Sequence, residues 1–147
     1  MGAFRGRKPV NPKYARILRT GPRFARRIRV HNLRRAKKLG YRPGMLVVTA
    51  RINRGGRKAP MPNHGRSTTK MLKTKTTPMS LGNILEKRVS RRYSNLQVLN
   101  SYEIYRTGQH KWFNVILFES AIDGSRAPKG RAERGLTSCG RKNRKLP

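Results

Sequence analysis

The stretch Leu96–Glu119, LQVLNSYEIYRTGQHKWFNVILFE, decides the fold of this chain. It contains two runs rich in β-branched and aromatic residues, Leu96–Tyr105 and Lys111–Glu119, separated by five residues that include Gly108. Apolar runs of this length on either side of a short glycine-containing loop are typical of a β-hairpin. The sequence therefore predicts a pair of antiparallel strands here.

The faces of this hairpin follow from its register. If Tyr105 lies opposite Lys111, one face collects an apolar set that suits packing against a helix: Val98, Ile104, Trp112, Ile116 and Phe118. The other face is also mostly apolar, with Leu99, Phe113, Val115 and Leu117. Strands that are apolar on both faces are typical of a sheet that is covered on both sides. We therefore expect a second covering layer.

The segment before the hairpin predicts an amphipathic helix. Thr77 is the expected N-cap, and Pro78 is the expected first helical residue. Apolar residues then recur at helical spacing, at Leu81, Ile84, Leu85 and Val89. Basic residues lie off that stripe, at Lys87, Arg88, Arg91 and Arg92. One face of the helix is expected to pack on the hairpin while the other presents charge.

Two more elements are expected further upstream. The stretch Met45–Ile52 alternates as a strand does, with Leu46, Val48, Ala50 and Ile52 on one face. Before it, Asn32 is the expected N-cap of a short helix that runs to Leu39. Gly40 then takes the left-handed position that ends many helices.

The charge of the chain is extreme and unevenly distributed. Its 147 residues hold 37 Lys and Arg against 5 Asp and Glu, a formal net charge of +32. From Met1 to Leu85 there are 23 Lys and Arg residues and no acidic residue. Positive charge on this scale opposes folding by self-repulsion and calls for a polyanion, which we expect to be nucleic acid. Arg outnumbers Lys 24 to 13, and guanidinium groups bind phosphate bidentately and stack on bases, so RNA is favoured.

The N-terminal region is the least regular part of the chain. Residues 1–11 are expected to form an extended arm, and Pro12–Arg19 a short helix. Between Phe24 and Val30 the apolar spacing fits a helix or a strand equally well. We interpret that stretch as a docked segment that RNA largely orders.

Together these elements predict an α+β fold, a small and mostly antiparallel sheet of three to four strands packed with helices, plus long basic extensions ordered by RNA. We expect a basic arm with a short helix over residues 1–31 and an α+β body over 32–121. The body carries a basic loop over 54–76, and a basic C-terminal extension covers 122–147.

The sequence does not favour catalysis. In the expected register Glu119 lies opposite Gln97, six residues from Glu103 and so about 20 Å away along the strand. Paired carboxylates and two-metal sites need much shorter separations. Glu86 is expected to pair with arginines on its own helix. Cys139 and the three histidines, His31, His64 and His110, lack zinc-ligand spacing, and Cys139 is interpreted as a small packing residue.

The run Arg54, Gly55, Gly56, Arg57, Lys58 follows a predicted strand but lacks the pattern of a phosphate-binding loop or a dinucleotide fingerprint. We interpret its glycines as letting the backbone approach phosphate while the flanking cations neutralise it. The alternative is a flexible hairpin tip.

The basic segments, broken by Gly and Pro, do not favour a membrane-binding helix, and neither a leader nor a run of 18 apolar residues is seen. With one cysteine and no internal disulfide, the chain is expected to be intracellular.

Three blocks of sequence carry a family resemblance. The longest runs from Thr77, Pro78 and Ser80 through Asn95–Tyr102 to Lys111, Trp112 and Val115–Leu117. The others are Leu39–Tyr41 leading into Arg54–Lys58, and Arg134–Ser138 followed by Gly140–Lys142. In this order they closely resemble an archaeal and eukaryotic family of large-subunit ribosomal proteins, number fifteen of the eukaryotic-type series.

The resemblance implies a structural constituent of the large ribosomal subunit, not an enzyme. Such a protein binds and stabilises rRNA by neutralising phosphates and recognising shape. Its implied partners are large-subunit rRNA and neighbouring ribosomal proteins, without a membrane or a small-molecule substrate. The implied location is the cytoplasm, in the ribosome. No cofactor is expected, and Mg²⁺ or K⁺ would be present only through the rRNA.

The residues that we expect to contact RNA are basic side chains and the glycines between them. They are Arg34, Arg35, Lys37, Lys38, Arg54, Gly55, Gly56, Arg57, Lys58, Arg66, Lys70, Arg88, Arg91, Arg134, Arg141 and Lys142. The alternative is a general nucleic-acid packaging protein, which would bind any polyanion. An RNA-processing enzyme is a third hypothesis, and it would depend on the few acidic residues.

Overall fold

The computed structural model describes residues 12–27, 30–55, 57–58, 74–75, 77–119 and 130–144. The elements follow in the order α1 (Pro12–Thr20), β1 (Phe24–Arg27), α2 (Leu33–Lys38), β2 (Leu46–Asn53), β3 (Arg57–Lys58), β4 (Thr74–Lys75), α3 (Leu81–Arg92), β5 (Gln97–Arg106), β6 (His110–Phe118) and α4 (Ser138–Asn143). The expected 1–11 arm and most of the 54–76 loop lie outside the described residues.

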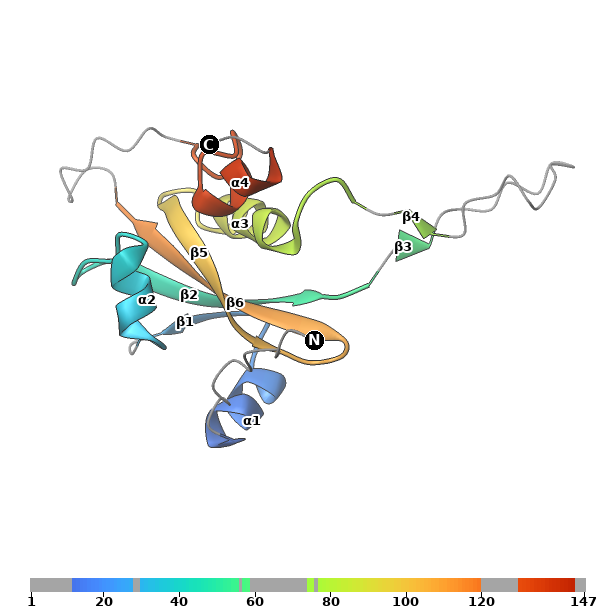
Figure 1. Ribbon diagram of the computed structural model, residues 1–147. Coiled ribbons are helices and arrows are strands. Elements are labelled where there is room, and N and C mark those ends of the chain that lie inside the picture. Colours follow the sequence, from blue (N-terminus) through green and yellow to red (C-terminus); the bar gives the residue numbers. More distant parts are fainter. Residues whose placement is uncertain are drawn as a thin grey trace, which may run out of the picture.

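An antiparallel sheet of four strands, in the order β1-β2-β6-β5, forms the centre of the body (Figure 1). Helices α3 and α4 lie on one side of it, and α1 and α2 on the other. The predicted α+β class with a small antiparallel sheet is therefore confirmed.

The main core lies between the sheet and α3. Its buried side chains come from one face of β2, from β5 and β6, and from the predicted stripe of the helix: Val48, Ala50, Ile52, Ile84, Leu85, Val89, Val98, Phe113, Val115 and Leu117. Each fully buried aliphatic side chain contributes about 1.5–3 kcal/mol to stability. Burial of this stripe places the charged face of α3 outward.

The opposite face of the sheet is covered as well, as its apolar residues predicted. Ala36 of α2 packs there on Tyr102 and Ile116. At the far end of the same face, Leu18 of α1 is buried, and its carbonyl accepts a hydrogen bond of 2.9 Å from Trp112 Nε1. The two N-terminal helices thus form the second covering layer.

The hairpin register is as predicted only in its middle. Tyr102 lies opposite Asn114, which fits the prediction, but Tyr105 pairs with Trp112 rather than with Lys111. Irregularities between Val98 and Asn100 and between Glu103 and Tyr105 shift the pairing at each end. A β-bulge inserts one unpaired residue, so the side chains beyond it point to the opposite face of the sheet.

These bulges overturn the expected faces of the hairpin. Val98 faces α3 together with Phe113, Val115 and Leu117, whereas Ile104 and Ile116 pack on the α2 side. The expected grouping of Val98 with Ile104, Trp112, Ile116 and Phe118 is wrong. Glu119 also does not lie opposite Gln97, which pairs with Phe118. Uninterrupted alternation cannot anticipate a bulge, because a bulge changes the face of every residue beyond it.

The start of α3 lies later than expected. The N-cap is Ser80, whose hydroxyl accepts a hydrogen bond from the amide of Asn83, and not Thr77. Ser80 is extended at φ −63° and ψ 151°, the usual conformation of a cap. Pro78 therefore precedes the helix instead of opening it.

Smaller elements agree with the sequence more closely. Helix α2 is capped by Asn32, and Gly40 adopts a left-handed φ of 93°. Over Phe24–Val30 the strand alternative applies to β1, which pairs with β2 from Phe24 opposite Ala50 to Arg27 opposite Val47. Main-chain pairing with β2 docks β1 on the sheet, and our interpretation that RNA largely orders the stretch stays a prediction.

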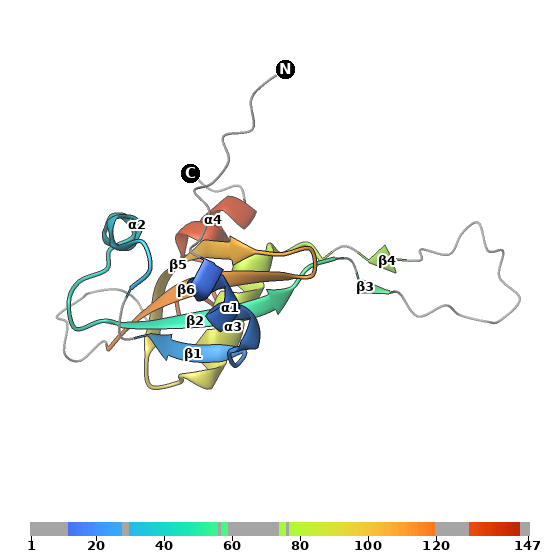
Figure 2. The same cartoon turned by 90° about the horizontal axis from the view of Figure 1, so that it is seen from below.

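The division into arm, body and extension stays a prediction, but one part of the expected extension packs on the body. Residues 130–144 form a turn and α4, and α4 contacts α3 and β5. The expected 54–76 loop also has structure near its ends, where β3 and β4 pair as a ribbon that projects from the body (Figure 2).

A chain of hydrogen bonds crosses the sheet on the α2 side. Arg27 Nε donates to Thr49 Oγ1 at 3.1 Å, and Thr49 donates to Asn114 Oδ1 at 2.7 Å. Asn114 Nδ2 donates to the hydroxyl of Tyr102 at 3.0 Å, which donates to the carbonyl of His31 at 2.5 Å. The chain joins all four strands and the entry to α2.

Tyr102→Phe should test this chain of hydrogen bonds. Removing the hydroxyl leaves the buried Asn114 amide without this acceptor, and an unsatisfied buried group costs about 1–3 kcal/mol. We expect the free energy of unfolding to fall by about 1.5 kcal/mol in urea denaturation. Tyr41→Phe is the control, since it removes a hydroxyl from a half-buried tyrosine of the same cluster. Equal losses in the two variants would contradict a special role for Tyr102.

Candidate nucleic-acid interface

Helix α2 presents four of the predicted RNA contacts on one short turn of chain. Ala36 is fully buried against the sheet, so the helix turns its basic residues outward. All four are exposed: Arg34, Arg35, Lys37 and Lys38. Arg35 is also positioned, because its guanidinium lies 5.6 Å from the ring centroid of Tyr102 and its Nη1 donates to the carbonyl of Glu103 at 3.3 Å. We call these four residues the α2 surface.

A second group lies where the β3–β4 ribbon leaves the body. Arg54, Gly55 and Arg88 line one pocket there, together with Arg23. Arg54 and Gly55 follow β2, whereas Arg88 comes from the middle of α3. The fold thus gathers predicted residues that stand more than 30 positions apart in the sequence.

The third group surrounds α4. Arg134, Arg141 and Lys142 are exposed. Arg91 of α3 lies on the same side, 3.8 Å from Glu133, and both side chains are mostly exposed. Exposed ion pairs contribute about 0–1 kcal/mol, so this pair barely restrains Arg91.

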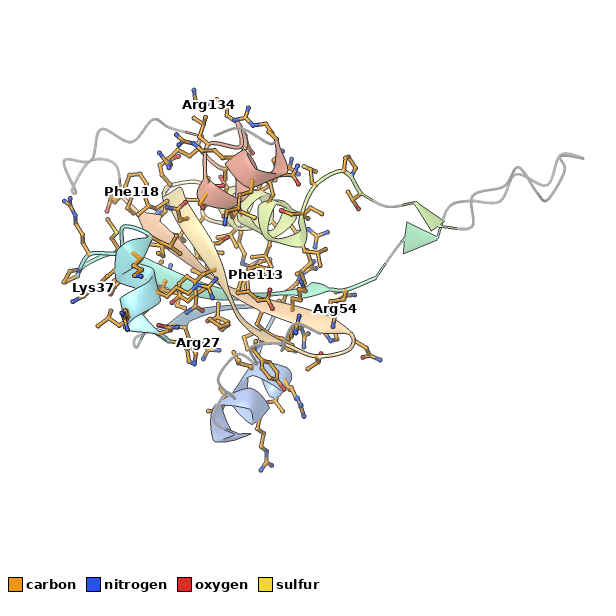
Figure 3. The ribbon with its side chains drawn as sticks, viewed as in Figure 1. Arg27, Lys37, Arg54, Phe113, Phe118 and Arg134 are labelled. Atoms are coloured by element: carbon orange, nitrogen blue, oxygen red, sulfur yellow. The ribbon has the colours of Figure 1, made fainter. Side chains whose placement is uncertain are left out.

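The predicted residues therefore surround the body in separate groups. In Figure 3, Lys37, Arg54 and Arg134 lie on three different sides of the body. Gly56, Arg66, Lys70 and the side chains of Arg57 and Lys58 lie outside what the structure describes. An arrangement of this kind suits a partner that contacts several sides of the protein.

Several arginines that the sequence analysis did not select are held on aromatic rings. Arg23 and Arg92 both lie over Phe24, at 5.7 and 5.5 Å from the ring centroid, and Arg26 lies 5.8 Å from that of Tyr93. Cation–π contacts of this kind are worth about 0.5–1 kcal/mol at exposed sites. They hold these guanidinium groups in place at the surface.

A similar contact lies at the hairpin loop. Arg19 stacks 5.9 Å from the ring centroid of Tyr105, and its Nη2 donates to the hydroxyl of that residue at 2.8 Å. These arginines were missed because their rings come from distant elements. Only the neighbouring pair Arg23 and Phe24 gave a local signal.

Glu86 does not pair with arginines of its own helix, so that expectation is wrong. It is fully buried and accepts hydrogen bonds from the hydroxyls of Ser101 and Thr137, the latter at 2.6 Å. Burial raises the pKa of Glu86, while the two hydroxyls and the charge of Arg131 act to lower it. The side chain of Glu86 faces inward and links α3 to Ser101 of β5 and to Thr137, the N-cap of α4.

Cys139 packs as the sequence interpretation expected. Burial raises the pKa of its thiol, and its Sγ lies 3.2 Å from Ser80 Oγ. A thiol with a raised pKa is a poor nucleophile and metal ligand. Within the described ranges, no three His, Cys, Asp or Glu side chains are grouped to hold a metal ion. No described helix is long and apolar enough to cross a membrane.

Comparison with known proteins decides the family. The family model described as ribosomal L15 matches residues 13–147. The chain belongs to the ribosomal L15e family. The resemblance seen in the sequence blocks is therefore confirmed.

One curated relative of this L15e-family chain is the large ribosomal subunit protein eL15 of Methanocella arvoryzae. It is 39% identical over 126 residues, which cover 76% of this chain and 64% of the relative. The chain thus aligns with less than two thirds of the length of that relative.

Proposed function

We propose that this L15e-family chain is a structural constituent of the large ribosomal subunit, not an enzyme. It binds and stabilises rRNA by neutralising phosphates and recognising shape, next to other ribosomal proteins in the cytoplasm. The observation that carries the proposal is the family match over residues 13–147. A relative of the same family is named as a large ribosomal subunit protein.

The geometry supports this role physically. The α2 surface and the basic groups near α4 lie on opposite sides of the sheet. A net charge of +32 needs neutralisation on all of these sides. RNA folded around the protein supplies phosphate in several directions, and each cation that meets a phosphate releases a counterion.

The sedimentation position of the tagged chain tests the proposal. We expect it to travel with the large subunit in a gradient and to remain there after a high-salt wash, because many contacts are made at once. Isolated rRNA fragments should be bound with a steep salt dependence, since each contact adds about 0.7–0.9 to the slope of log affinity against log salt.

Three results would contradict this proposal. An even spread over bulk nucleic acid would favour the packaging alternative, and a shallow salt slope would contradict multiple phosphate contacts. Cleavage of RNA that is lost in Glu103→Gln would instead favour an RNA-processing enzyme.

A further inference from the structure

The pocket at the root of the β3–β4 ribbon has a defined floor and rim. We call it the root pocket, and its volume is about 340 Å³. Its floor includes Ile52 and Ile84, which belong to the main core. Its rim is formed by Arg23 and Arg54, which are exposed, and by Arg88, which is half-buried. The floor is thus rigid, whereas the rim is charged.

The charged side chains in the lining of the root pocket are all basic. Its lining contains three arginines and no Asp or Glu. Like charges that converge on one space repel each other, and the repulsion is relieved when an anion enters. The lining therefore favours an anionic ligand.

Arg23 and Arg54 are held by contacts with the body before any ligand arrives. Arg54 Nη1 donates a hydrogen bond to the carbonyl of Thr107 at 2.6 Å, and the backbone amide of Arg54 donates one to the carbonyl of Gln109 at 2.7 Å. Arg23 stacks on Phe24. Side chains that are already placed lose less conformational entropy on binding, which strengthens the complex.

The lining also distinguishes between anions. None of its residues is aromatic, so it offers no ring on which a base would stack. The pocket volume of about 340 Å³ is enough for a phosphate and parts of its two sugars. Three guanidinium forks match the oxygens of such a group.

The position of the pocket points to a polymer. Gly55 lies at its edge with a φ of 103°, and nothing lies within 4 Å of the place where a Cβ would be. The chain turns there into the ribbon, where Arg57 pairs with Lys75 across the two strands. A polyanion that leaves the pocket along the ribbon would meet further basic residues.

We infer that the root pocket binds one phosphodiester of an RNA backbone, with Arg23, Arg54 and Arg88 donating to its non-bridging oxygens. This inference rests on the proposed function, because it takes RNA as the partner. It adds to that function a single anchoring site at which the ribbon and the body meet the same strand of RNA.

Phosphate neutralisation in the RNA tests the inference. The tightest-binding fragment of large-subunit rRNA is prepared with single methylphosphonates, each of which removes one backbone charge. With the wild-type chain, we expect one position to weaken binding about tenfold or more, which is the loss of one charge-assisted contact. In the double variant Arg23→Gln with Arg88→Gln, a methylphosphonate at that position should no longer weaken binding, whereas methylphosphonates at the other positions should affect binding as they do with the wild type.

The single variants and a charge-matched control complete the experiment. Arg23→Gln and Arg88→Gln should each weaken binding to unmodified RNA about tenfold. The affinity of the double variant should fall by a smaller factor than the product of the two single factors, because both arginines bind the same phosphate. Arg106→Gln removes the same charge from an exposed position outside the root pocket, and should change binding by less than about threefold. If melting shows that Arg88→Gln is destabilised, Arg23→Gln alone is compared with the same control.

The outcomes separate the two proposals. If the wild-type chain binds no rRNA fragment, the proposed function fails and the inference fails with it. If the chain binds RNA but Arg23→Gln behaves like Arg106→Gln, the root pocket is not an anchoring site and the proposed function stands. The same conclusion follows if every methylphosphonate acts equally on the wild type and the double variant.

Discussion

Gly140→Ala is expected to destabilise the chain by about 3 kcal/mol, because the substitution adds an atom where backbone already lies. A Cβ on Gly140 would lie 2.6 Å from the Cα, carbonyl carbon and oxygen of Gly135. Gly135 itself has a left-handed φ of 67°, so its turn has little freedom to move aside. The free energy of unfolding from urea denaturation measures the loss.

The control for Gly140→Ala is Gly108→Ala in the hairpin loop. A Cβ on Gly108 would meet nothing within 4 Å, so the change should stay within about 0.5 kcal/mol. If both variants lose the same stability, the close approach of Gly135 and Gly140 does not hold the turn that precedes α4 against that helix. Hydrogen exchange in α4 should increase in Gly140→Ala, because the helix would be the first element released.

The dependence of α4 on two glycines shows what a hydrophobic pattern leaves out. The strands β2 and β6 were predicted to within a residue or two, since alternation and apolar runs carry their signal locally. The turn and helix over 130–144 have few large apolar residues. They dock on the body instead by hydrogen bonds, from Thr137 Oγ1 to the carboxylate of Glu86 at 2.6 Å and from the Ser138 amide to Asn100 Oδ1 at 2.9 Å. Such contacts leave no periodic mark in the sequence.

The exposure of the candidate residues on helix α2 was predictable from the sequence, whereas the arrangement of the separate groups around the body was not. Lys37 and Lys38 were selected from composition and helix position, and the structure exposes them. Their separation from Arg134 by the sheet follows from tertiary packing alone. The stacking of Arg92 on Phe24 joins positions far apart in the chain, so no local pattern reveals it.

Glu86→Ala is expected to lower the free energy of unfolding by about 3 kcal/mol. The substitution removes the shared acceptor of two hydroxyls, those of Ser101 and Thr137, and leaves a gap in a fully buried site. Buried donors without partners cost about 1–3 kcal/mol each, and part of this loss is offset because a desolvated carboxylate is also removed. Glu133→Ala is the control, since that exposed acid should change stability by less than about 1 kcal/mol.

Glu86→Gln separates the charge of this carboxyl group from its hydrogen bonds. Because burial raises the pKa of Glu86 in the folded state, the folded chain holds the proton more tightly than the unfolded chain does. Its contribution to stability is full below the unfolded pKa and is lost as the pH rises through the folded pKa. The difference in unfolding free energy, wild type minus Glu86→Gln, should therefore fall as the pH rises above the ordinary carboxyl pKa and level off above the raised pKa of the folded state. A difference that stays constant or rises over this range would mean that the hydroxyls and Arg131, and not burial, dominate the protonation of Glu86.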